Sequence, residues 1–185
     1  MKLGLSPILA VLLFPIFLGL GAAPAAAHGA TRQKVVETVD INLPPDKVWA
    51  IVRDFDGLAK WHPAAASSVA DKGNQEGSVR TLVLKAPGDP KIIEELLSYD
   101  DAGRSYHYGI KEVDVKVLPV TNYTSWLTVR DNGHGGSTVE WKGAFYRGFP
   151  NNDPPPELND DAAIAAVTAV YRSGLDNLKK IAETP

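Results

Sequence analysis

The sequence contains no cysteine, and its only methionine is the first residue. The absence of thiols excludes disulfides, thiolate metal sites and cysteine nucleophiles. It also excludes a c-type haem attachment motif, so the chain carries no covalent haem of its own. Stability must therefore come from side-chain packing.

Basic clusters and catalytic motifs are also missing. The chain carries 19 Lys and Arg residues against 22 Asp and Glu residues, a formal net charge of −3. No run of basic residues offers a footprint for nucleic acid, so we expect no nucleic-acid partner. No recognisable catalytic motif appears along the chain, so the motifs give an enzymatic function no direct support.

The one long apolar stretch lies at the start of the chain. Lys2 precedes an apolar run over residues 3–20, and residues 25–27 supply an Ala-x-Ala site. A short positive region, an apolar core and a small-residue exit predict a secretory signal peptide over residues 1–27, cleaved after Ala27. A transmembrane anchor is the alternative, but two prolines interrupt the run and disfavour it.

Residues 28–185 are expected to form a single domain in the periplasm, without a stable membrane anchor. They number 158 and carry 18 basic and 22 acidic residues, a net charge of −4. A chain of this length can bury one substantial core.

Alternating apolar and polar residues predict a series of strands in this region. After the first strand, a double proline and the helical spacing of Val48, Ile51, Val52 and Phe55 predict a short helix that stops at Gly57. Short links rich in Gly, Asp and Asn imply antiparallel pairing of neighbouring strands. The predicted strands cover residues 34–43, 77–85, 92–99, 104–110, 123–130 and 137–147.

A long helix is predicted at the C-terminus. Asn159 supplies an N-cap, Asp160 and Asp161 make an acidic first turn, and an apolar stripe continues to about Glu183. A curved antiparallel sheet must bury one face, and this helix is the only element large enough to cover it. The sequence therefore predicts an α+β helix-grip fold: a curved antiparallel sheet wrapped around the long C-terminal helix, two short helices after the first strand, and a cavity at the end of the long helix.

Several motifs resemble the START/Bet v 1-like (SRPBCC) helix-grip superfamily, in its polyketide cyclase/dehydrase-like branch. They are Pro45-x-x-Val48-Trp49, Phe55-x-Gly57, Trp61-His62-Pro63, Gly77-Ser78-Val79-Arg80, Glu94-x-Leu96-x-x-Tyr99-Asp100, Tyr106-x-Tyr108 and Leu118-Pro119-Val120. More narrowly, the chain is similar to the MxaD family of periplasmic accessory proteins of bacterial methanol oxidation. That similarity rests on Trp61-His62-Pro63, Leu118-Pro119-Val120-x-Asn122-Tyr123, Val139-Glu140-Trp141-x-Gly143-x-Phe145-Tyr146-Arg147-Gly148 and Leu158-Asn159-Asp160.

The narrower resemblance implies a role beside a PQQ-dependent quinoprotein methanol dehydrogenase and its c-type cytochrome, which are the expected protein partners. Without a haem motif of its own, the chain would assist electron transfer and not carry electrons. The inferred cavity leaves two other classes open: a carrier of a lipid or other hydrophobic small molecule, and a cyclase- or hydrolase-like enzyme. We expect no enzymatic activity, no cofactor and no metal.

The superfamily resemblance implies that Arg80, Glu94, Tyr108, Tyr123 and Glu140 face the interior. Strand alternation also places Arg80, Glu94 and Tyr108 each on one face with apolar neighbours. Because an unpaired buried charge is costly, these residues predict either a polar ligand site or an internal Arg–Glu pair that sets the sheet geometry. Glu94 or Glu140 would be the general base of an enzyme.

Two further features suit a surface role. Trp61-His62-Pro63 borders the cavity or contacts a partner, unless Trp61 packs over the short helices and His62 caps a turn. Arg147 lies in a proline-rich loop over residues 146–156, which fits either a docking surface or a plain linker. His28 would be the mature N-terminal residue and could chelate a metal with a second histidine, but no spacing selects that partner.

Overall fold

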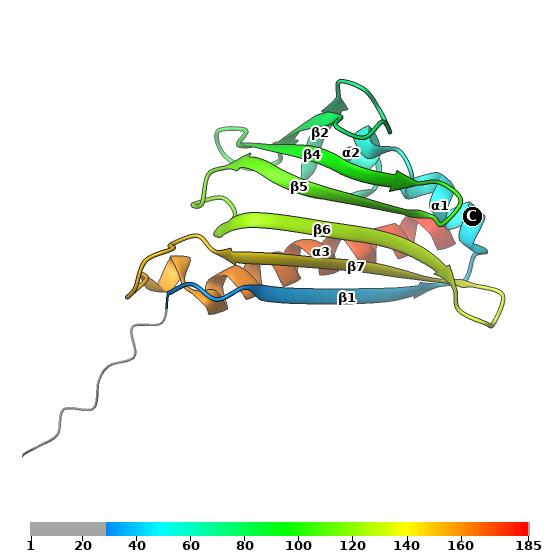
Figure 1. Ribbon diagram of the computed structural model, residues 1–185. Coiled ribbons are helices and arrows are strands. Elements are labelled where there is room, and N and C mark those ends of the chain that lie inside the picture. Colours follow the sequence, from blue (N-terminus) through cyan, green and yellow to red (C-terminus); the bar gives the residue numbers. More distant parts are fainter. Residues whose placement is uncertain (1–28, 185) are drawn as a thin grey trace, which may run out of the picture.

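The protein forms a curved, seven-stranded antiparallel sheet with the order β1-β7-β6-β5-β4-β3-β2. The structure is a computed structural model that describes residues 29–184, so the predicted signal peptide and its cleavage site lie outside the described residues. In Figure 1 the sheet curves around the long helix α3, which crosses its concave side. The strands are β1 (Gln33–Ile41), β2 (Ala65–Ala70), β3 (Val79–Leu84), β4 (Lys91–Asp100), β5 (Ser105–Val113), β6 (Val120–Asp131) and β7 (Ser137–Arg147).

Three short helical segments follow β1: α1 (Pro45–Val52), the 3-10 helix η1 (Phe55–Gly57) and α2 (Leu58–Trp61). The first helix ends earlier than predicted, because Asp54 adopts an extended conformation and the Phe55 N–H bonds to the Asn74 side chain at 2.7 Å. The helices therefore continue as two short pieces that close one end of the sheet. The predicted helix-grip fold is confirmed.

Strand β2 was not predicted from the sequence. Its residues are mostly alanine and serine, which have little preference for strands. β2 lies at the edge of the sheet and pairs only with β3, for example through Val69 and Thr81. Pairing with an existing strand, and not local propensity, makes this segment extended.

Helix α3 (Asp160–Glu183) begins and ends as predicted. The Asn159 side chain accepts a hydrogen bond from the Ala162 N–H at 2.8 Å, which satisfies one of the free donors of the first turn. A short 3-10 helix, η2 (Pro156–Leu158), precedes it. Within residues 29–184, no helix combines the length and apolarity that a membrane crossing requires.

Glycine at position 174 lets α3 approach the sheet closely. A Cβ atom there would lie 2.6 Å from Cδ2 of His62 and 2.8 Å from Cζ3 of Trp141, closer than van der Waals contact allows. One turn earlier, Tyr171 is fully buried and stacks on Trp141 with ring centroids 4.5 Å apart. The helix and the concave face are thus packed directly against each other around Trp141, and a cavity remains beside this contact.

Candidate functional site

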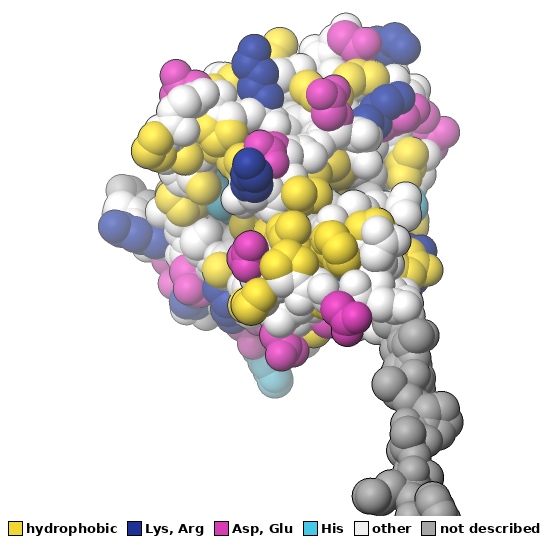
Figure 2. All heavy atoms as spheres, turned by 90° about the vertical axis from the view of Figure 1, so that its left-hand side faces the viewer, with side chains coloured by type: hydrophobic (Ala, Val, Ile, Leu, Met, Phe, Trp, Pro, Cys, Tyr) yellow, Lys and Arg dark blue, Asp and Glu magenta, His cyan; other side chains and the backbone are white. Residues whose placement is uncertain are grey.

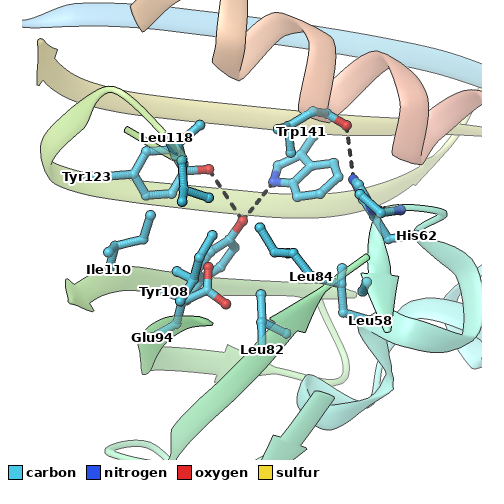
Figure 3. A pocket seen from close by; sticks show the side chains of 15 residues that line it. Leu58, His62, Leu82, Leu84, Glu94, Tyr108, Ile110, Leu118, Tyr123 and Trp141 are labelled. Carbon is cyan, nitrogen blue, oxygen red and sulfur yellow. Dashed lines mark hydrogen bonds between the residues drawn. The ribbon is translucent and has the colours of Figure 1, made fainter. Parts of the chain in front are cut away.

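The cavity lies between the concave face of the sheet, α2 and α3, and its volume is about 100 Å³. Figure 3 shows its wall of apolar side chains with a few polar groups among them. Val117 and Leu118 come from the β5–β6 connection, at the end of the molecule that Figure 2 presents. Apolar side chains gather near the centre of that face, with charged side chains of both signs around them. The lining residues are Leu58, His62, Ala64, Ala65, Leu82, Leu84, Ile92, Glu94, Tyr108, Ile110, Val117, Leu118, Tyr123, Trp141 and Val170.

A chain of hydroxyl groups crosses the protein beside the cavity. Ser125 donates to the carbonyl oxygen of Lys142 at 2.9 Å, which commits its only proton. The Tyr171 hydroxyl lies 2.9 Å from Ser125 and must donate to it, so the Tyr123 hydroxyl, 2.5 Å from that of Tyr171, must donate in turn. By the same reasoning Tyr108 donates to Tyr123 across 3.4 Å. The hydrogen bonds therefore run in one fixed direction, from Tyr108 to the backbone of β7.

Trp141 completes this chain at the cavity. Its Nε1–H donates to the Tyr108 oxygen at 3.1 Å, and Figure 3 shows two hydrogen bonds meeting at that oxygen. Burial raises the pKa of Tyr108, Tyr123 and Tyr171 well above the usual range, so the hydroxyls stay protonated at neutral pH. With every proton of the chain in use, Tyr108 can accept a hydrogen bond from a ligand but cannot donate one.

Arg80 and Glu94 form a buried ion pair between β3 and β4. Arg80 Nε and Nη2 lie 2.8 Å and 2.6 Å from the same carboxylate oxygen, Oε2 of Glu94. Nη1 donates to the Phe55 carbonyl oxygen at 2.5 Å, and the guanidinium lies 4.1 Å from the centre of the Phe55 ring. Burial raises the pKa of Glu94, and the adjacent guanidinium opposes that shift. Glu94 also lines the cavity, so the same carboxylate pairs with Arg80 across β3 and β4 and forms part of the cavity wall.

His62 is held as a neutral imidazole in the cavity wall. The Ala64 N–H donates to Nδ1 at 3.2 Å, so the proton sits on Nε2, which donates to the Val170 carbonyl oxygen at 3.0 Å. Burial lowers the pKa of His62, in keeping with this tautomer. Both nitrogen atoms are occupied, which leaves His62 neither a free base nor a free acid for a ligand.

One of the two predictions placed Trp61 on an exposed rim of the cavity, and the structure contradicts it. It is 1% exposed and packs against Trp141 with ring centroids 5.5 Å apart. Its Nε1 has no hydrogen-bond partner among the described residues. Of the Trp61-His62-Pro63 motif, only Pro63 is exposed. Trp61 therefore has the structural role that the sequence left open as the alternative, whereas His62 borders the cavity as predicted and is held there by its two hydrogen bonds.

The structure corrects the expected positions of Glu140 and Arg147. Glu140 lies on the outer face of the sheet, because Val139 and Trp141 on either side of it point inward. Its carboxylate lies 3.6 Å from Arg130 and 3.7 Å from Lys142. It therefore contributes neither a ligand contact nor a base to the cavity.

Arg147 is buried and holds the segment between β7 and α3, so it is not available to a partner. Its guanidinium donates to the carbonyl oxygens of Phe149 at 2.7 Å and Asn151 at 2.8 Å. It also bonds to Asp160 at 3.2 Å, in the first turn of α3. The proline-rich segment is thus tied to the start of the helix.

The other predicted cavity residues face the concave side. Arg80, Glu94, Tyr108 and Tyr123 are all buried there, while ligand binding by them stays a prediction. The sequence reasoning missed Trp141, although alternation along residues 137–147 places its side chain inward. It also missed the polar roles of Tyr171 and Ser125, since the C-terminal helix was described only by its apolar stripe and its polar ends. Within residues 29–184, no group of three or more acidic or histidine side chains could hold a metal ion.

A curved antiparallel sheet that grips one long helix beside a small, mostly apolar cavity defines the class of helix-grip cavity proteins. Residues 32–183 match the family described as "Polyketide cyclase / dehydrase and lipid transport". The chain belongs to this family, which includes both cyclases and binding proteins. A search of curated proteins finds no match to the chain.

Solved structures share this fold. The protein XoxI from Bacillus cereus is 31% identical, with a TM-score of 0.67 over 80% of this chain and 94% of that one. The ZhuI aromatase/cyclase from Streptomyces sp. R1128 is 18% identical, with a TM-score of 0.65 over 83% and 94% of the two chains. Norcoclaurine synthase from Thalictrum flavum is 14% identical, with a TM-score of 0.63 over 84% and 96%. The last two comparisons show the fold alone.

Proposed function

We propose that this chain is a periplasmic binding protein without catalytic activity. It receives a small, largely apolar molecule that carries a hydrogen-bond donor, and it assists a PQQ-dependent methanol dehydrogenase and its c-type cytochrome. The observation that carries the proposal is the cavity, which is small, apolar and equipped only to accept hydrogen bonds. The accessory role is supported by the motifs shared with the MxaD family.

The size of the cavity disfavours the alternative of a lipid carrier. Pockets for drug-sized ligands measure roughly 300–1,000 Å³. The cavity here measures about 100 Å³, which suits a molecule of a few heavy atoms. A lipid chain or a polyketide would require α3 or the β5–β6 connection to move away from the sheet.

The chemistry of the wall disfavours a cyclase-like enzyme. A general base needs a free lone pair within reach of the substrate and a suitable pKa. Both nitrogen atoms of His62 are occupied, and Tyr108 has neither a free proton nor a pKa near neutrality. Glu94 keeps one carboxylate oxygen, Oε1, without a partner among the described residues. Glu94 is therefore the one candidate base among the described residues of the wall, and it has neither a free acid nor a nucleophile beside it. Its Oε1 and the Tyr108 lone pair are placed to receive a donor from a bound ligand.

The ligand part of the proposal is tested with two isomers, 1-butanol and diethyl ether, of which only the alcohol donates a hydrogen bond. The Trp141 indole N–H, which bonds to Tyr108, serves as the reporter in a two-dimensional ¹H–¹⁵N NMR titration. We expect 1-butanol to shift this signal and diethyl ether to shift it much less. Leu84→Phe, which fills the cavity, should abolish the shift, whereas Val83→Phe on the same strand should not.

Two outcomes would contradict the ligand part: equal shifts with both isomers, or a Leu84→Phe variant that still responds. The accessory role is tested separately, by biolayer interferometry with the purified methanol dehydrogenase and its cytochrome from the same organism. We expect salt-sensitive binding to at least one of them. If neither binds, the accessory role is wrong, whatever the cavity holds.

A further inference from the structure

The outer, convex face of the sheet carries a row of side chains that the cavity does not use. Val36 pairs with Lys142, Lys142 pairs with Trp126, and Trp126 pairs with His107. These four residues stand side by side on β1, β7, β6 and β5. The row therefore crosses four strands in exact register, with an aromatic pair at one end.

The side chains of the neighbouring row are mostly short. Lys34 pairs with Ala144, Ala144 with Thr124, and Thr124 with Gly109. Because three of these side chains are small or absent, the surface is hollowed beside the tall Trp126 row. The resulting groove has a volume of about 420 Å³, and we refer to it as the convex groove; it is lined by Arg32, Lys34, Val36, His107, Thr124, Trp126, Lys142, Gly143 and Ala144.

The rim of the convex groove exposes apolar surface, part of which is held in place by aromatic stacking. Val36 is 55% exposed and Trp126 37% exposed, two of the five large hydrophobic residues with the most exposed side chains among the described residues. The Trp126 ring lies flat on the His107 ring, with centroids 4.2 Å apart and planes 2° apart. An ordered, half-exposed tryptophan loses little conformational entropy when a partner covers it, which is why tryptophan is enriched among interface residues that dominate affinity.

The charge around the convex groove is opposite to that of the whole chain. Arg32, Lys34 and Lys142 line it, while the chain carries a net charge of −3. No carboxylate of residues 29–184 lies within ion-pair distance of Arg32 or Lys34. Lys142 has one acidic neighbour, Glu140 at 3.7 Å, which is shared with Arg130. The groove thus combines an apolar anchor with two cations, Arg32 and Lys34, that have no acidic partner among residues 29–184, and a third, Lys142, whose acidic neighbour is shared.

We propose that the convex groove docks an acidic segment of another protein. An apolar side chain of that segment sits in the hollow against Trp126, and flanking carboxylates pair with Arg32, Lys34 and Lys142. A second copy of this chain is disfavoured, because two identical cationic faces repel each other. An anionic membrane is disfavoured because a flat bilayer does not fill a hollow and the net negative charge of the chain opposes it. The inference goes beyond the proposed function, since it holds whether or not the cavity binds a ligand.

The probe for this surface is a synthetic peptide, Ac-Glu-Glu-Phe-Glu-Glu-NH₂, with Ac-Lys-Lys-Phe-Lys-Lys-NH₂ as its basic counterpart. In a ¹H–¹⁵N NMR titration of the purified protein, we expect the acidic peptide to shift the Trp126 indole N–H. The Trp141 indole N–H, inside the protein, should not move. The affinity should fall as salt is raised, because exposed charges are screened.

Variants separate docking from a general charge effect. The double variant Lys34→Glu with Lys142→Glu should lower the affinity for the acidic peptide by about tenfold or more, which corresponds to roughly 1.4 kcal/mol. Lys47→Glu with Lys91→Glu changes the charge equally at exposed positions away from the groove and should leave the affinity within about twofold. Trp126→Thr, a strand-compatible change, should also lower it, while circular dichroism checks that each variant is folded.

Four results of the peptide and vesicle experiments would overturn the proposal. They are no Trp126 shift at millimolar acidic peptide, equal binding of the basic peptide, equal loss in both double variants, or binding of phosphatidylglycerol vesicles through Trp126 in place of the peptide. A concentration-dependent dimer that Lys34→Glu abolishes in analytical ultracentrifugation would likewise replace the docking segment by a second copy.

Discussion

Replacing Glu94 by leucine is expected to be among the most destabilising single changes in the sheet. The substitution removes the carboxylate that receives both Nε and Nη2 of Arg80 at 2.8 Å and 2.6 Å. The Arg80 side chain is 1% exposed and cannot reach water without leaving its place between β3 and the Phe55 ring. A buried guanidinium would therefore lose its counter-charge and gain no solvent in exchange.

The magnitude follows from the burial of the pair. Removing one partner of a buried ion pair costs about 3–5 kcal/mol, a large part of the roughly 5–15 kcal/mol that stabilises an ordinary domain. Removing both, as Arg80→Met with Glu94→Leu, eliminates the unpaired charge. The bond from Arg80 to the Phe55 carbonyl is then the main loss, at about 1–3 kcal/mol. The double variant should therefore be more stable than Glu94→Leu alone by about 2 kcal/mol.

Urea unfolding followed by circular dichroism measures the four corners of this cycle. The slope with urea should be unchanged, which identifies a change in stability and not in the compactness of the states. The matched control is Lys111–Glu95, an ion pair of the same 2.8 Å length whose side chains are 49% and 33% exposed. Breaking that pair should cost no more than about 1 kcal/mol. Additivity of the Arg80 and Glu94 variants within about 0.5 kcal/mol, or an equal loss on breaking the exposed pair, would show that burial does not strengthen the dependence of Arg80 on Glu94.

Three further predictions concern the contact between α3 and the sheet. Tyr171→Phe deletes the central hydroxyl of the buried chain and leaves the Tyr123 donor unsatisfied. Urea unfolding should show that the free energy of unfolding falls by about 1–3 kcal/mol. No fall would mean that water replaces the hydroxyl. Gly174→Ala should destabilise by about 1–3 kcal/mol through overpacking, although alanine favours a helix by about 1 kcal/mol, and a gain in melting temperature would contradict the close approach. For His62 the pKa is lowered in the folded state from its ordinary value of 6.5, so the unfolded state binds the proton more readily. Its contribution to stability is therefore complete above pH 6.5 and falls below it, by up to about 1.4 kcal/mol per pH unit. His62→Gln should flatten this part of the stability profile, and equal slopes in both proteins would show that another group titrates.

The two faces of the sheet differ in the functions that we propose for them. The concave face and α3 enclose the cavity, whereas the convex groove presents Trp126 and three cations to the outside. Residues that alternate along one strand serve opposite faces: Trp141 donates to Tyr108 inside, and its neighbour Lys142 lines the convex groove. Substitutions on one face can therefore test ligand binding and protein docking independently.

Local patterns in the sequence account for most of the elements. Alternation identified six of the seven strands, and the Asn159 cap identified the start of α3, because side-chain periodicity follows directly from backbone geometry. β2 was not predicted, because its alanine and serine residues have little preference for strands. Its extended conformation comes from pairing with β3. Glu140 was misplaced although its own strand held the correction: alternation with Val139 and Trp141 requires it to face outward.

Near neighbours along the chain were enough to predict six of the seven strands, the C-terminal helix, the α+β class and the inward direction of Arg80, Glu94 and Tyr108. The size of the cavity, the burial of Trp61 and Arg147, and the direction of the hydroxyl chain depend instead on contacts between distant segments. Ser125 and Tyr171 are 46 positions apart, and the Val36–Lys142–Trp126–His107 row joins four strands. Strand register and the seating of α3 bring such groups together, and both arise from packing between distant segments, which no local pattern encodes.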